Sequence, residues 1–113
     1  MRKQMIENAA YEVGAQVRVV EGSIDAALAE VAELQARIMH ANSVAGVGFA
    51  AVHPTLEQLA SAVGTLVATR GAIVGCHAAL ADAKGKVPGL RTFAIGDTEC
   101  PPASARGQLH AVA

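Results

Sequence analysis

The sequence predicts an all-α protein, in which a long antiparallel helical hairpin forms a four-helix bundle by homodimerisation and carries an extended C-terminal tail. Apolar residues fall alternately four and three apart from Ile6 to Ala45, without a proline, which indicates one long helix. A second heptad row from Leu56 to Leu80 indicates another. A hairpin of 113 residues has little interior of its own, so we expect a second copy to complete the core, with twofold symmetry.

The first helix is predicted over residues 5–45. The β-branched residues Val17, Ile24, Val31 and Ile38 occupy a positions of its heptads, and Val13, Val20 and Leu34 occupy d positions. Its flanking positions are partly small or apolar, as at Gly14 and Leu28, and partly charged. The buried stripe therefore widens from a two-stranded seam toward that of a multi-helix bundle.

A glycine-punctuated segment, residues 42–54, is predicted to form the apex of the hairpin. Gly46 or Gly48 can adopt the left-handed conformation that ends a helix, and Pro54 is expected to precede the next one. The two glycines lack the third glycine and the preceding strand of a phosphate-binding fingerprint.

The second helix is predicted over residues 55–85. Thr55 and Gln58 form a capping box at its start, while Gly85 caps its end and Pro88 prevents continuation. A second apolar row lies beside its heptad row: Ala60, Val67, Val74 and Ala81. One partner helix cannot bury both rows, which again favours a bundle.

The second helix also carries a small residue about once per turn: Ala60, Gly64, Ala68, Gly71, Gly75 and Ala79. Small residues at this interval let two helix backbones approach closely. This pattern fits a tight soluble bundle, and a membrane-associated hairpin is the alternative. The charged residues on the helix favour the soluble bundle.

The predicted helix interface is formed by the apolar heptad positions of both helices. Its residues are Val13, Val17, Val20, Ile24, Val31, Leu34, Ile38, Leu59, Val63, Leu66, Ile73 and Leu80.

Two polar residues interrupt this interface on the second helix. Arg70 and His77 occupy consecutive a positions, so both should point toward the seam. A buried arginine needs a partner, which would be a carboxylate such as Glu21 or Glu30, or an anionic ligand. Arg70 and His77 are thus the candidate ligand-binding residues.

Composition narrows the class of protein. Net charge is −1 and the nine basic residues are scattered, so no nucleic-acid footprint is visible. Three aromatic residues are few for a cofactor pocket, and no cofactor is expected. No histidine lies three residues after a glutamate, the four histidines match no zinc spacing, and no catalytic motif occurs, so neither a metal nor an enzyme is predicted.

The remaining signals concern location and the tail. Two cysteines without a secretory signal indicate reduced thiols and a cytoplasmic protein. After Pro88 the pattern becomes extended, so residues 88–113 are predicted to form a tail with one or two short strands, or an exposed flexible one. The expected function is a non-enzymatic homo-oligomeric assembly or protein-interaction module. A small-molecule or anion-binding bundle, possibly an enzyme, is the alternative.

Overall fold

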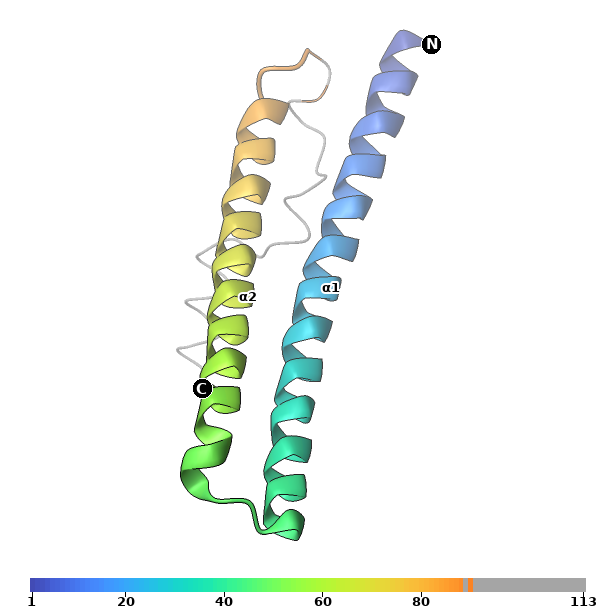
Figure 1. Ribbon diagram of the computed structural model, residues 1–113. Helices are drawn as coiled ribbons and strands as arrows, with labels where there is room; N and C mark the ends of the chain where they lie inside the picture. The colour runs from blue at the N-terminus through green and yellow to red at the C-terminus, as the bar shows by residue number, and fades with distance from the viewer. Residues whose placement is uncertain (89, 91–113) are drawn as a thin grey trace, which may run out of the picture. The chain divides into compact units, whose positions relative to one another are not determined.

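The computed structural model describes residues 1–88 and 90, and it contains two long helices joined as a hairpin (Figure 1). Helix α1 spans Arg2–Ala45 and helix α2 spans Phe49–Lys84. No strand occurs among the described residues. The predicted all-α class and helical hairpin are therefore confirmed.

The hairpin divides into two compact units. One, which we call the turn unit, is Val20–Ile73 and contains the connection between the helices. The other, the terminal unit, combines Met1–Val19 with Val74–Ala113. Each unit thus pairs a segment of α1 with a segment of α2.

The buried stripe of α1 follows the predicted seam in part. The a-position residues Val17, Ile24 and Val31 are shielded, as expected. At the d positions, however, Val13 and Leu34 are about half exposed. The d-position residues Val20 and Ala27 are shielded. Four residues one position beyond d are shielded as well, namely Gly14, Glu21, Leu28 and Asn42, whereas Gln35 is exposed. A single neighbouring helix covers only a narrow stripe, and the small Gly14 lies in it.

Most of the predicted interface residues are shielded within the chain. Those that are buried or half-buried are Val17, Val20, Ile24, Val31, Ile38, Leu59, Val63, Leu66 and Ile73. Val13, Leu34 and Leu80 remain exposed. The contact between α1 and α2 therefore uses most of the apolar heptad positions and leaves three of the larger ones open.

Gly46 ends α1, as one of the two glycines was expected to do. Its φ of 68° lies in the left-handed region, which a side chain disfavours. The N–H groups of Gly46 and Val47 donate to the carbonyl oxygen of Asn42 at 2.9 and 3.3 Å. This pattern satisfies a carbonyl that the end of the helix would leave free.

Helix α2 begins at Phe49, so the predicted capping box at Thr55 is wrong. Both Pro54 and Thr55 lie inside the helix. The N–H of Ala51 donates to the carbonyl oxygen of Gly48 at 3.1 Å, which closes the first turn before the proline is reached. Proline costs the helix the bond that its missing N–H would make to the carbonyl oxygen of Ala50. This loss falls in the second turn of the helix, directly after the N–H groups that have no helical acceptor.

The other end of α2 falls at Lys84, where it was predicted, but by a different geometry. Gly85 does not take a positive φ. Its N–H bonds the carbonyl oxygen of Asp82 at 3.1 Å, and the N–H groups of Lys86 and Val87 likewise bond three residues back. The helix thus tightens into 3₁₀-type turns before Pro88. The predicted tail beyond this point, including Cys100 and the possible strands, lies outside the described residues.

The interior of the described hairpin is small. Three of its side chains are buried, namely Ile24, Leu90 and His77, with 8, 6 and 5% exposure. None of the described side chains is fully enclosed. A hydrophobic core of this size contributes little of the burial that stabilises a domain.

Candidate functional site

Arg70 forms an ion pair across the hairpin in the turn unit. Its Nε atom donates a hydrogen bond to Oδ1 of Asp25 at 2.8 Å. This bond and the charge of Asp25, with a further contribution from Glu21, raise the pKa of Arg70 above its usual value. Both side chains of the pair are 56% exposed. Arg70 is therefore a solvated charge at the edge of the seam rather than a buried one.

The partner of Arg70 was predicted imperfectly. Glu21 and Glu30 were the expected carboxylates, whereas the hydrogen bond goes to Asp25 and Glu21 adds only its charge. The sequence held a usable signal. Arg70 lies 23 residues after Val47, and Ile24, next to Asp25, lies 23 residues before it. Residues equidistant from the apex of an antiparallel hairpin lie side by side, because both helices rise equally per residue.

His77 is the most buried polar residue among the described residues of the terminal unit. It lines a cavity of about 190 Å³ together with apolar side chains of both helices. These side chains include Val13, Val17, Leu80, Val87 and Leu90, and Lys84 is the charged residue among the lining residues. The cavity is therefore mostly apolar, and His77 and Lys84 are its two lining residues with polar side chains.

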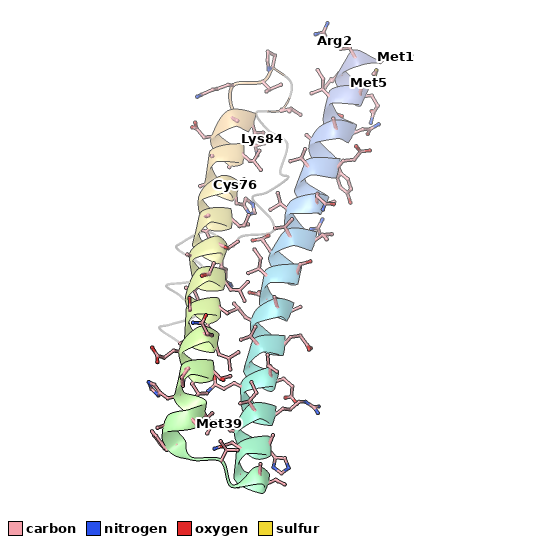
Figure 2. The ribbon with its side chains drawn as sticks, in the orientation of Figure 1. Met1, Arg2, Met5, Met39, Cys76 and Lys84 are labelled. Carbon is pink, nitrogen blue, oxygen red and sulfur yellow. The ribbon has the colours of Figure 1, made fainter. Side chains whose placement is uncertain are left out.

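Cys76 precedes His77 but lies on a different side of α2. Cys76 is exposed and His77 is buried, as expected for adjacent helical residues, which point about 100° apart. Figure 2 labels Cys76 and Lys84 on the C-terminal part of α2. Among the described residues, no group of histidine, cysteine and carboxylate side chains could hold a metal ion.

The two predicted ligand residues have separate surroundings. Arg70 belongs to the turn unit, where it is exposed and bound to Asp25. His77 belongs to the terminal unit, where it is buried beside the cavity. A site built from both residues together is not described by the structure, so any ligand site must be argued for each residue alone.

Exposed apolar side chains form the most extensive unexplained feature of the described chain. On α1 they include Val13, Val19 and Leu34, and on α2 they include Val67, Val74 and Leu80. Between Gln58 and Ala81 the only charged residue is Arg70. By length and composition α2 could cross a membrane, and none of its most apolar window is buried. Its outer surface therefore lacks the charges that normally keep a solvated helix soluble.

Glycines on α2 add to this feature. A side chain built at Gly64, Gly71 or Gly75 would meet nothing within 4 Å in the described chain. Each glycine costs a helix about 1 kcal/mol relative to alanine. No neighbour inside the hairpin explains this cost.

Comparisons with models of protein families, with curated proteins and with solved structures gave no match. The residues themselves are therefore the basis for function. They offer a solvated ion pair that joins the two helices in the turn unit, an apolar cavity beside His77, and an apolar surface on α2 that is exposed in the described part of the chain.

Proposed function

We propose that this protein is a non-enzymatic assembly module whose hairpin pairs with a second copy to form a four-helix bundle with twofold symmetry. The observation that carries this proposal is the set of half-exposed apolar side chains on both helices, among them Val13, Leu34 and Val67. An apolar helix stripe has to be buried against another element, and one hairpin supplies only one layer. A second hairpin would supply the missing layer.

The distribution of charge supports self-association in the turn unit. Here α1 exposes Glu30, Glu33 and Arg37, and the last two form an ion pair at 3.0 Å. The α2 segment of this unit carries Arg70, whose guanidinium forms an ion pair with Asp25. A bundle can therefore keep the charges of α1 in water while it buries apolar surface of α2. We propose that the dimer is cytoplasmic and that its outer surface can bind a protein partner.

Sedimentation of the full chain at micromolar concentration tests this proposal. We expect a dimer with a helical circular dichroism spectrum. A well-folded helical monomer at these concentrations would contradict it, because the exposed apolar rows would then be stable in water.

The cavity at His77 supports a second candidate, a small-molecule-binding bundle. Its apolar wall suits a small apolar molecule or the apolar part of an amphipathic one. Titration with the fluorescent anion 1-anilinonaphthalene-8-sulfonate tests this. Saturable binding that Leu80→Asp abolishes and Phe49→Asp leaves intact would support the candidate, since Phe49 belongs to the turn unit and does not line the cavity. Equal binding by both variants would contradict it.

The membrane-associated hairpin is a minor alternative, supported by the composition of α2. It predicts that the chain floats with phospholipid vesicles and requires detergent for extraction. Recovery of the expressed chain in the soluble fraction without detergent would argue against it.

A further inference from the structure

We infer that the ring of Phe93 occupies the apolar cavity beside His77 in the same chain. Phe93 follows Leu90, the last residue that the structure describes, by three positions. An apolar ligand then enters the cavity only by displacing the ring. The inference does not depend on the proposed self-assembly and goes beyond it, since the cavity lies within the terminal unit of one chain.

The path of the described chain after α2 leads back to the cavity. The N–H of Leu90 donates to the carbonyl oxygen of Val87 at 3.1 Å, which closes a turn, and both residues line the cavity. Leu90 is 6% exposed, so its side chain is packed on the hairpin rather than directed into water. The residues that follow Leu90 therefore start from the wall of the cavity itself.

Chain length keeps Phe93 close to the cavity. Three residues span at most about 11 Å when fully extended. The Cα atom of Phe93 therefore lies within about 11 Å of the Cα atom of Leu90, whatever path the chain takes. A side chain tethered this closely has an effective concentration in the millimolar range, so it competes strongly with a free ligand for the cavity.

The cavity has the size and character that a phenyl ring needs. Its volume is about 190 Å³. An apolar protein cavity of about 150 Å³ is large enough to bind benzene. Its wall includes Val17 from α1 and Leu80 from α2. Arg91 and Thr92 are polar, so Phe93 is the first large apolar residue after the described chain.

Two apolar residues in the cavity wall lack full cover within the described hairpin. Val13 and Leu80 line the cavity and are 48% and 37% exposed. A ring in the cavity covers both from within the chain. The exposed Leu34 and Val67 belong to the turn unit and remain available to a second copy.

A second hollow beside Leu90 is less suited to the ring. Its lining residues are Arg2, Lys3, Ile6, Glu7, Pro88 and Leu90. Half of these side chains are charged, and an apolar ring among them would displace water that solvates the charges. The described lining of the cavity beside His77 contains one lysine, Lys84, and neither arginine nor a carboxylate.

Nuclear magnetic resonance tests the contact directly. Phe49 and Phe93 are the two phenylalanines of the chain, so in Phe49→Leu every phenylalanine ring signal belongs to Phe93. Phe49 is 90% exposed and lies in the turn unit, so its substitution leaves the cavity unchanged. We expect nuclear Overhauser effects from the ring of Phe93 to the methyl groups of Val13 and Leu80. Ring signals without such contacts, or contacts found only between two differently labelled copies, would overturn the inference.

Unfolding of a matched pair of variants is the second test. Phe93→Ala should lower the urea midpoint by about 1 M, because a shielded ring is lost, and Phe93→Leu should lower it less. Phe49→Ala removes the same ring from a position that is 90% exposed and should leave the midpoint unchanged. Equal midpoints for the two alanine variants would overturn the inference.

Ligand binding shows whether the ring competes for the cavity. The apparent affinity for a ligand falls in proportion to the fraction of molecules in which its site is open. Phe93→Ala should therefore bind 1-anilinonaphthalene-8-sulfonate about tenfold more tightly than the wild type does. Weaker binding by Phe93→Ala would overturn the inference, because the ring would then be part of the ligand site and not its competitor.

The outcomes are distinct from those that test the proposed assembly. A wild-type monomer in which the ring of Phe93 contacts Leu80 would contradict the assembly and support this inference. A wild-type dimer without that contact would support the assembly and overturn this inference.

Discussion

Arg70 shows how a charged residue can occupy a core heptad position without being buried. The a position brings its backbone to the seam, but the seam between two helices is narrow and its edges are wet. A long side chain can leave such a seam and keep its charged end in water. Its guanidinium does so and meets Asp25 at 2.8 Å. Arg70 therefore ties the helices together in the turn unit without a desolvated charge.

Removal of this ion pair should cost little stability. We expect Arg70→Met and Asp25→Asn each to lower the urea midpoint slightly, and the double variant to lose no more than the larger single loss. Exposed pairs are weakened by water and salt, so the effect should shrink in high salt. Urea unfolding at low and high salt measures this, and a large loss that is insensitive to salt would contradict it.

The pH dependence of this pair follows from the direction of the shift. The pKa of Arg70 is raised in the folded protein. A base with a raised pKa contributes stability below its unfolded pKa and loses it only as the pH rises through the folded value. The contribution of Arg70 should therefore persist from neutral to alkaline pH. A comparison of wild type with Arg70→Met at pH values over this range checks it.

Gly46 should tolerate substitution poorly. Its positive φ disfavours any residue with a side chain, so we expect Gly46→Ala to destabilise the protein by about 1–2 kcal/mol. Gly48 is a matched control, since a side chain there meets nothing and its φ is not positive. Gly48→Ala should be neutral or slightly stabilising. Equal losses in urea unfolding would place the left-handed residue elsewhere in the connection.

At the scale of the element, the start of α2 shows that a capping sequence alone does not fix where a helix begins. Thr55 and Gln58 match a capping box, and Pro54 suits the residue before a helix or its first turn. The structure instead extends the helix back to Phe49. Val52 lies in this added segment and is half-buried, so the longer helix buries one more apolar side chain. Gly48, a conformationally flexible residue, directly precedes the helix.

Two substitutions distinguish the two helix starts. Replacing an N-cap threonine by alanine lowers the free energy of unfolding by about 1 kcal/mol. The same replacement inside a helix leaves it unchanged or raises it by a few tenths of a kcal/mol. We therefore expect Thr55→Ala to be neutral or stabilising. Pro54→Ala should stabilise the protein by up to about 2 kcal/mol, because it restores an N–H for the carbonyl oxygen of Ala50. Loss of stability in Thr55→Ala, measured by urea unfolding, would restore the capping box.

Helix period and helix ends could be predicted from the sequence to different degrees. The heptad rows predicted both helices, and Gly46 and Lys84 fell where glycine punctuation indicated. Near the start of α1, Val13 is exposed and Gly14 is buried, although the two are adjacent and both fit an apolar stripe. Periodicity alone cannot choose between them. The choice depends on the neighbouring helix, which a single helix pattern does not contain.

The candidate site was less predictable than the helices. Asp25 is the partner of Arg70 because the length of the connection sets which residues of the two helices lie opposite each other. The connection in the structure is residues 46–48, whereas a longer apex, residues 42–54, was predicted. The cavity beside His77 depends on Leu90 and Val87 beyond the helix end. The helix period in the sequence does not predict the path that the chain takes after the helix ends.

At the scale of the whole molecule, stability is the central question. Helices in proteins gain most of their stability from the packing of an apolar face against other elements. The described hairpin buries Ile24, Leu90 and His77 and leaves residues such as Val67 and Val74 exposed. Its net stability as a single chain should therefore be low, since burial has to exceed the conformational entropy of ordering two long helices.

Dilution should therefore unfold this protein. If folding and dimerisation are coupled, each tenfold rise in concentration adds about 1.4 kcal/mol of apparent stability per dimer, and the urea midpoint should increase accordingly. Circular dichroism over two orders of magnitude in concentration measures this, with sedimentation on the same samples. A urea midpoint that does not move with concentration would mean that two helices are stable alone, and the exposed rows would then need another explanation.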